Sequence, residues 1–281
     1  MKIKCLFWNI NRKASPFENV INDITKDIDI LVLAEAENIN DTSLCALTGF
    51  HAIKSSNIHD HSNLTPKVYA KPNGFSITHL NTAVSKRMVL NLLKVNGHEE
   101  IIFSGIHFPS KLEYSSSTQE SIANSYAGWI NEVENLFGLK RTILVGDFNM
   151  NPFEGGMIKP KTFNATLSKN IAETDLVRRF HFEDFDYFYN PMWNFMGDVD
   201  YNSGMNRLPG SYYFRTTTDD EAIYWNVIDK VIARPEVIKH LNLSSIEFPM
   251  SINGHVFMDV NYDFDSINYS DHLPLKFELK F

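Results

Sequence analysis

The sequence contains little cysteine and no long apolar run, and each shortage excludes a class of protein. Two cysteines, Cys5 and Cys45, in 281 residues are too few for a disulfide framework or a cysteine-based zinc site, so we expect both to be small buried hydrophobic residues. The N-terminal apolar run ends at Asn9, too early for a signal peptide. No stretch approaches the roughly 20 apolar residues of a transmembrane helix. We therefore expect a cytoplasmic protein.

Two hydrolase motifs are also missing. The sequence has no glycine-rich Walker loop, which disfavours a P-loop nucleotide hydrolase, and no Gly-x-Ser-x-Gly elbow, which argues against an α/β-hydrolase. Apolar residues make up 43% and charged residues 21%, as in ordinary globular proteins and unlike disordered ones. Because no internal repeat or linker-like segment interrupts the chain, we expect residues 1–281 to form a single domain.

Basic residues are fewer than acidic ones, 26 against 34, so the net charge is −8. This balance argues against a general nucleic-acid binder, because Lys and Arg supply most non-specific affinity for phosphate. The region of about 180–225 holds fourteen aromatic, eight acidic and only two basic residues, and therefore most of the charge. Two interpretations of this acidic insertion stay open: an aromatic subcore beneath long loops, or a wall of the substrate pocket.

The order of expected elements alternates strands and helices, which is typical of an α/β fold. Apolar periodicity and turn signals predict strands at 2–8, 29–33, 66–71, 87–95, 100–106, 142–145 and 275–281. Capping boxes at Ser15-Pro16-Phe17-Glu18 and Ser117-Thr118-Gln119-Glu120 predict helices over 17–28 and 117–137. Asn96-Gly97 predicts a hairpin turn.

Polar side chains follow the ends of these strand-like runs. They are Asn9, Glu35, His107, Asp147 with Asn149, and Asp271 with His272, and Asp229 lies inside the apolar run 227–232. Strand ends on a rigid sheet are common positions for functional sites. Carboxylate and amide oxygens without thiolates fit Mg²⁺ or Mn²⁺ better than zinc. These residue types therefore indicate metal-assisted hydrolysis of a phosphoester.

The ordered motifs resemble the endonuclease/exonuclease/phosphatase superfamily, which has the deoxyribonuclease I-like fold. The most specific are Gly146-Asp147-Phe148-Asn149 and Ser270-Asp271-His272-Leu273-Pro274, and the others are Phe7-Trp8-Asn9-Ile10-Asn11, Asp29-Ile30-Leu31-Val32-Leu33-Ala34-Glu35, Gly105-Ile106-His107 and Ile228-Asp229. The resemblance implies an α/β fold, a four-layer αββα sandwich of two packed mixed β-sheets flanked by helices. It also implies a site at one edge of the sandwich.

The resemblance implies a metal site built from Glu35, its companion amide Asn9, and Asp271. Glu37 competes with Glu35, because two residues apart on a strand would point to the same face; the resemblance favours Glu35. His59-Asp60-His61 has the composition of a metal motif but is better explained as a solvated loop. Asp259, Asp263 and Asp265 alternate along the chain, which predicts the solvent face of a strand.

The resemblance also implies a catalytic group. Asp147 would orient or deprotonate the attacking water, and Asn149 would position the nucleophile and phosphate. Asp229 would hydrogen-bond His272 and favour its charged form, which would stabilise charge on the phosphoryl oxygens. His107 would contact phosphate or protonate the leaving oxygen.

The implied function is that of a divalent-metal-dependent phosphodiester hydrolase, a nuclease acting on DNA or RNA. Aromatic side chains such as Trp193 and Tyr212, with Asn11, would contact the substrate, and the acidic surface favours a single strand over a long duplex. One alternative is a phosphatase or phosphodiesterase for a nucleotide, inositol phosphate or lipid head group, although residues 225–230 lack the arginine of inositol-phosphate enzymes in this superfamily. A further alternative is an inactive binding module. The sequence leaves open DNA or RNA, endo- or exonuclease action, and one or two metal ions.

Overall fold

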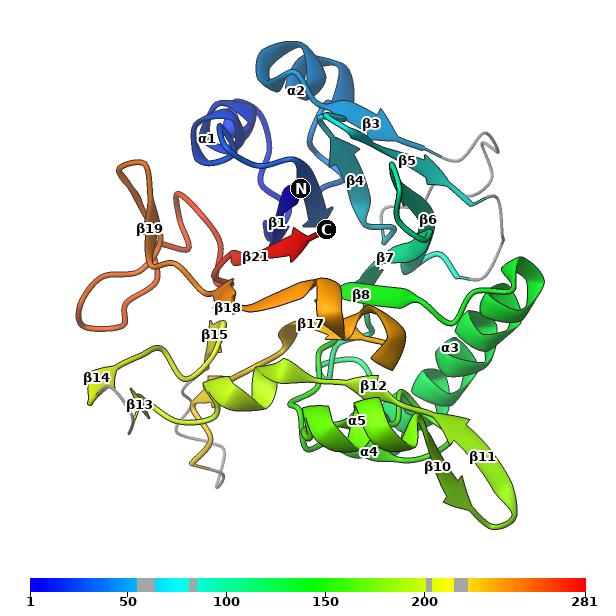
Figure 1. Ribbon diagram of the computed structural model, residues 1–281. Coiled ribbons are helices and arrows are strands. Elements are labelled where there is room, and N and C mark those ends of the chain that lie inside the picture. The colour runs from blue at the N-terminus through cyan, green and yellow to red at the C-terminus, as the bar shows by residue number, and fades with distance from the viewer. Residues whose placement is uncertain (55–63, 81–84, 201–203, 215–221) are drawn as a thin grey trace.

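The computed structural model describes residues 1–54, 64–80, 85–200, 204–214 and 222–281. Its centre is a pair of mixed β-sheets (Figure 1). The first has the strand order β18-β21-β1-β2-β4-β3, with β1 (Lys2–Asn9), β2 (Ile30–Ala34), β3 (His51–Ile53), β4 (Lys67–Ala70), β18 (Leu241–Glu247) and β21 (Leu275–Lys280). The second has the order β5-β6-β7-β8-β17-β12-β9, with β5 (Phe75–His79), β6 (Met88–Val95), β7 (Ile101–His107), β8 (Thr142–Asp147), β9 (Ala165–Thr166), β12 (Phe188–Tyr189) and β17 (Asp229–Ala233).

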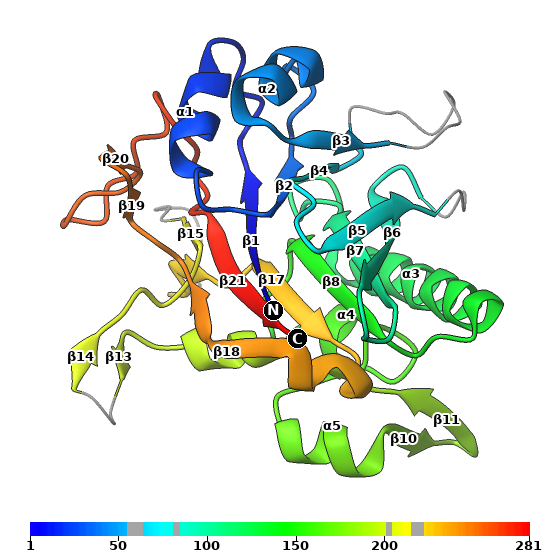
Figure 2. The ribbon, with the colours of Figure 1, turned by 45° about the horizontal axis from the view of Figure 1, so that its top comes forward.

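Helices lie outside both sheets, which confirms the predicted αββα sandwich. α1 (Phe17–Ile24) and α2 (Asp41–Thr48) lie beside the first sheet, while α3 (Ser116–Phe137), α4 (Gly155–Ile158) and α5 (Lys169–Asp175) flank the second (Figure 2). The chain termini meet, since the Phe281 N–H donates to the Met1 carbonyl at 2.8 Å. Because β21 is antiparallel to β1, the end of β1 and the start of β21 meet at the opposite end of the sandwich.

The central strands of the second sheet, β6, β7 and β8, are buried on both faces because each face is covered. On β6, Val89 and Leu93 belong to the core between the sheets, whereas Leu90 and Leu92 belong to the core beneath α3. Gly105 of β7 allows the sheets to approach: a Cβ there would lie 3.0 Å from a methyl carbon of Val32 on β2. Continuous apolar runs are thus explained by burial on two sides.

Smaller elements complete the fold. The acidic insertion and the residues just before it form two-stranded ribbons, β10 (Val177–Phe180) with β11 (Glu183–Asp186), β13 (Val199–Asp200) with β14 (Met205–Asn206), and β15 (Tyr212–Tyr213) with β16 (Trp225–Asn226), and a 3₁₀ helix, η2 (Pro191–Phe195). Another 3₁₀ helix, η3 (Pro235–His240), and the ribbon β19 (Ser251–Ile252) with β20 (His255–Val256) follow β17. The described part of the chain contains no helix long and apolar enough to cross a bilayer.

Both predicted capping boxes are wrong in detail. α3 begins at Ser116 and is capped by Ser115, whose hydroxyl accepts the Thr118 N–H, so Ser117 is not the cap. α1 begins at Phe17 and has no side-chain cap, because Pro16 lies at the cap position; the Glu18 carboxylate, expected to complete the box, accepts the Asn40 N–H. Where several hydroxyls or acids follow one another, spacing alone does not decide which one caps.

Two further predictions have different outcomes. Asp259, Asp263 and Asp265 do not lie on a strand: they lie in turns, and Asp259 accepts the N–H groups of Asn261 and Asp263. Local side-chain hydrogen bonds to the backbone compete with a strand ladder here. His59-Asp60-His61 lies outside the described residues.

Candidate active site

Three predicted residues lie side by side on neighbouring strands of the second sheet. Asp147 at the end of β8 is in register with His107 on β7 and with Asp229 on β17. Gly146, which precedes Asp147, is required by the close approach of β7, since a Cβ there would lie 1.9 Å from the Ile106 carbonyl oxygen. The strand pairing therefore brings together residues that are far apart in the sequence.

Asn9 joins this group from the other sheet. It lies at the end of β1, is buried, and its Nδ2 donates to Asp147 Oδ2 at 3.1 Å and to Glu35 Oε1 at 3.2 Å. Its Oδ1 accepts the Asn11 N–H at 3.1 Å. In this orientation the amide links carboxylates from the two sheets, one from Glu35 after β2 and one from Asp147.

Asp147 has an unusual electrostatic environment. Burial, followed by the neighbouring Asp229 carboxylate, raises the pKa of Asp147 to about 7, although His272 opposes the shift. Its oxygens accept hydrogen bonds from the Asn149 N–H at 2.8 Å and from Asn149 Nδ2 at 3.0 Å. Asn149 has a φ of +50°, a conformation that asparagine tolerates better than most residues. A carboxyl that titrates near neutrality is suited to proton transfer.

Asp229 and His272 form a buried pair. Nδ1 of His272 lies 2.9 Å from Asp229 Oδ2, and the Trp8 indole N–H donates to the His272 carbonyl at 2.8 Å. Burial opposes a charge on the ring, but the Asp229 carboxylate outweighs it and raises the pKa of His272 to about 10. The imidazole is therefore protonated near neutral pH.

His107 has the opposite tendency. Burial, together with the nearby Arg87 and His272, lowers the pKa of His107 to about 4. Its Nε2 lies 3.5 Å from Glu35 Oε1. The ring is thus neutral near pH 7 and offers one N–H donor and one acceptor.

Glu35 and Glu37 do not share a strand face, because β2 ends at Ala34 and Glu35 has a φ of +48°. Both carboxylates lie near the exposed side chain of Arg12, whose Nε is 3.4 Å from Glu35 Oε2 and 3.3 Å from Glu37 Oε1. Only Glu35 also contacts Asn9 and His107 among the hydrogen bonds and ion pairs of the described residues. Geometry thus links Glu35 more closely to the Asp147 group.

The remaining predicted residues lie around this centre. Asp271 Oδ1 accepts from Asn11 Nδ2 at 3.0 Å, which joins the loop after β1 to the start of β21. The Tyr212 ring lies 4.9 Å from the His272 ring. The Phe214 ring lies nearly parallel to the Tyr212 ring, with the two ring centres 6.3 Å apart. Trp193 packs on Phe153, with the two ring centres 6.5 Å apart.

One group of acidic and histidine side chains in the described residues is close enough to hold a metal ion. Ligand atoms of Asp147, Asp229 and His272 all lie within 4.8 Å of one another. Nδ1 of His272 is already hydrogen-bonded to Asp229, so the trio also contains a carboxylate–imidazole pair beside the Asp147 carboxylate. The roles of Asn9, Glu35 and Asp271 as metal ligands stay predictions.

Two buried residues of the site were not predicted. Gln119, expected to belong to a capping box, donates from Nε2 to the carbonyls of Pro109 and Asn149. Lys230, next to Asp229, is fully buried and donates to backbone carbonyls near Asn149. The sequence does contain a signal for Lys230: it lies within the apolar run 227–232, and a lysine buried there needs hydrogen-bond or charged partners.

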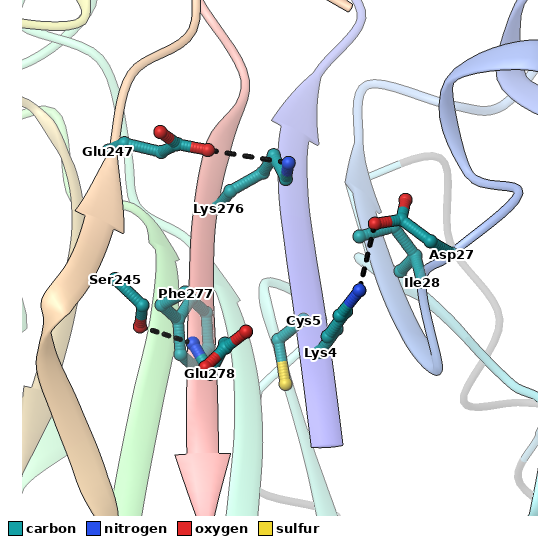
Figure 3. A pocket seen from close by; sticks show the side chains of 9 residues that line it. All are labelled: Lys4, Cys5, Asp27, Ile28, Ser245, Glu247, Lys276, Phe277 and Glu278. Carbon is teal, nitrogen blue, oxygen red and sulfur yellow. Dashed lines mark hydrogen bonds and ion pairs between the residues drawn. The ribbon is translucent and has the colours of Figure 1, made fainter. Parts of the chain in front are cut away.

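A pocket elsewhere on the protein is lined by residues of β1, β18 and β21 (Figure 3) and includes none of the candidate residues. Its charges are already paired: Lys4 Nζ lies 3.0 Å from Asp27 Oδ2, and Lys276 Nζ lies 3.3 Å from a Glu247 oxygen. The strand-end cluster around Asp147 is therefore the stronger candidate for chemistry.

Comparisons with known proteins support the fold. No protein-family model matches the sequence, and no curated protein matches it in sequence. Among solved structures, the endonuclease domain of the telomere-specific non-LTR retrotransposon TRAS1 matches with a TM-score of 0.55, 12% identity and 99% of each chain covered. The 3′ phosphatase NExo from Neisseria, bound to a product DNA hairpin, matches with a TM-score of 0.53 and 12% identity, over 99% of this chain and 100% of that one.

An endonuclease/exonuclease/phosphatase from Bacteroides vulgatus matches with a TM-score of 0.56 and 14% identity, over 100% of this chain and 99% of that one. These likenesses extend over the whole chain and show that it has the endonuclease/exonuclease/phosphatase fold. The fold predicted from the sequence motifs is thereby confirmed.

Proposed function

We propose that this protein is a phosphodiester hydrolase that uses Mg²⁺ or Mn²⁺ and acts on nucleic acid. The observation that carries the proposal is the set of neighbours around Asp147: His107 and Asp229 in register on adjacent strands, and Asn9 hydrogen-bonded from the other sheet. A buried carboxyl group with a raised pKa can act as a general base, and the protonated histidine beside it can stabilise negative charge. The two roles are thus assigned to two different side chains.

In the proposed mechanism Asp147 orients the attacking water and accepts its proton, while the Asn149 amide positions the water and the phosphate. His272, held in its charged form by Asp229, stabilises negative charge on the phosphoryl oxygens. His107, neutral near pH 7, donates a hydrogen bond to the phosphate. Positioning and electrostatic stabilisation supply most of the rate enhancement in phosphoryl transfer.

The cation would be held by the carboxylates of Glu35 and Asp271, with Asn9 as the companion amide. The donor set fits a hard divalent ion, because it contains oxygens and no thiolate. The exposed Arg12 guanidinium is the contact that a cation would replace at Glu35 Oε2. A bound Mg²⁺ or Mn²⁺ would polarise the phosphoryl group.

A nucleic-acid substrate is supported by two of the similar structures, an endonuclease domain and a 3′ phosphatase bound to a DNA hairpin. The Tyr212 ring beside His272, with Phe214 exposed next to it, favours a single strand whose bases stack on aromatic rings. Because the second of these structures is a phosphatase, a small phosphomonoester remains an alternative substrate for this protein. We place the activity in the cytoplasm, as the sequence predicts.

The proposal is tested with purified protein, Mg²⁺ or Mn²⁺, and a panel of single- and double-stranded DNA, RNA and small phosphomonoesters. We expect metal-dependent cleavage of phosphodiesters, fastest on single strands. Hydrolysis of monoesters alone would replace the nuclease proposal with a phosphatase. Absence of hydrolysis across the panel, with retained binding to one substrate, would favour a binding module.

A further inference from the structure

Lys230 is a basic side chain in an apolar interior, where burial lowers its pKa to about 7. It lies on β17, is 0% exposed, and pairs in register with Gly146 of β8. Successive residues of a strand point to opposite faces, so Lys230 points away from Asp229 and toward the core beneath α3, where its Nζ lies 5.6 Å from the centre of the Phe148 ring. Burying an ammonium group is costly unless it is fully hydrogen-bonded.

The ammonium of Lys230 finds its partners in backbone carbonyls. Nζ donates to the carbonyl of Met150, to that of Val227 at 2.5 Å and to that of Ile228 at 3.3 Å. Three acceptors match the three N–H donors of an ammonium group. The side chain therefore joins two backbone segments: the turn that follows Asp147 and the residues that precede Asp229.

Both segments carry catalytic groups in the proposed function. The turn holds Asp147 and Asn149, and the second segment leads into Asp229. Other hydrogen bonds join the same two segments: the Phe148 N–H donates to the Ile228 carbonyl at 2.9 Å, and the Val227 N–H donates to Asn151 Oδ1 at 2.9 Å. Lys230 is the only fully buried lysine in the described residues. It joins the two segments on the face of the sheet opposite the catalytic carboxylates.

We propose that Lys230 is a positioning residue, which fixes the turn carrying Asp147 and Asn149 against the strand carrying Asp229. The inference rests on the proposed function for its effect on catalysis. It predicts that loss of the ammonium displaces the two carboxylates and the amide relative to each other. Displacement by about 1 Å at a reacting centre can reduce the rate by about 10²-fold.

The test compares Lys230→Met with a matched control, Arg234→Met. Arg234 follows β17, is also buried, and donates to Glu134 and to the Asp186 carbonyl. Both variants lose a buried cation and are expected to be destabilised. If Lys230 positions the catalytic turn, Lys230→Met lowers kcat by about 10- to 100-fold with KM within about threefold, whereas Arg234→Met keeps kcat within about threefold of wild type.

Amide hydrogen exchange provides a readout that does not require activity. We expect faster exchange at residues 147–151 in Lys230→Met and unchanged exchange there in Arg234→Met. Should Lys230→Met fail to fold, Lys230→Gln, which keeps a shorter donor, serves in its place with the same expected direction. Unchanged kcat and unchanged exchange at 147–151 would overturn the inference. An inactive wild-type protein would instead contradict the proposed function, while the exchange measurement would still test Lys230.

Discussion

Asp229 accepts a hydrogen bond from Nδ1 of His272 at 2.9 Å, and both side chains are buried. The bond fixes the orientation of the ring, with Nδ1 toward Asp229. The carboxylate also outweighs the effect of burial, so that the pKa of His272 is raised to about 10. The pair thereby provides a fixed positive charge next to Asp147.

Substituting Asp229→Asn removes this support. The pKa of His272 should fall from about 10, because burial is then opposed only by the carboxylates of Asp147 and Asp271. We expect kcat at pH 8 to drop by about 10² to 10⁴-fold. In wild type, deprotonation of His272 should reduce activity near pH 10, and in Asp229→Asn this loss should occur at a lower pH. A pH profile together with NMR titration of the His272 ring measures both effects; an unmoved alkaline limb contradicts the role of the pair.

The ionisation of Asp147 should determine how activity depends on pH at the acidic end of the pH profile. The pKa of Asp147 is raised to about 7 by burial and then by Asp229, and only the carboxylate form can accept a proton. Activity should therefore rise as pH increases through about 7. Asp147→Asn should lower kcat by about 10² to 10⁴-fold at pH 8, and by less at acidic pH, where Asp147 of the wild type is protonated. Asp41→Asn, which alters a carboxylate outside the site, is the matched control and should leave kcat unchanged.

Asp41 contributes to stability instead. Its carboxylate contacts Lys54, Lys67 and the Tyr69 hydroxyl. Burial opposes its charge, but these partners lower the pKa of Asp41 from 3.8 to about 2. A lowered carboxyl pKa stabilises the native state above the unfolded pKa and loses that effect as pH falls through the folded one. Asp41→Asn should therefore lower the free energy of unfolding by about 1–2 kcal/mol at pH 7, and less at pH 3. Denaturant midpoints at the two pH values test this difference.

Much of the fold, and the polar side chains that it brings together at the strand ends, could be predicted, because both depend on local patterns. Apolar runs predicted the main strands, and the polar residues that follow them, such as Asn9 and Glu35, proved to lie in contact. Asp147 and Asp229 are separated by 81 intervening residues, yet each could be identified from its own short motif. Strand ends gather at sheet edges, which makes this kind of prediction possible.

The parts that could not be predicted depend on which partner a polar side chain selects in space. Gln119 fits a capping box in sequence, but its amide donates to the carbonyls of Pro109 and Asn149. Ser115 caps α3 because its hydroxyl reaches the Thr118 N–H, although a run of hydroxyl residues offered other caps. Glu35 and Glu37 could not be separated by periodicity, because β2 ends before both of them.

Removal of the metal and mutation of its ligands distinguish these two glutamates. A chelator should reduce activity by about 10² to 10⁴-fold. Glu35→Gln should weaken Mn²⁺ binding, measured by calorimetry, by about 10- to 100-fold. Glu37→Gln, which also loses a contact with Arg12, should change it by less than about threefold. A larger effect from Glu37 than from Glu35 would reverse the assignment of the ligand.

Substitution of Tyr212 tests whether the substrate is a single-stranded nucleic acid. The Tyr212 ring lies 4.9 Å from His272 and nearly parallel to that of Phe214, which is 48% exposed. A base stacked on an aromatic ring contributes about 1–3 kcal/mol, which corresponds to roughly a 5- to 150-fold change in affinity. Tyr212→Ala should therefore raise KM for a single-stranded oligonucleotide by this factor, and leave KM for a small phosphodiester without bases nearly unchanged. Trp193→Ala, which removes a ring that packs on Phe153, is the comparison. Equal effects of Tyr212→Ala on both substrates would show that Tyr212 supports His272 instead of stacking on a base.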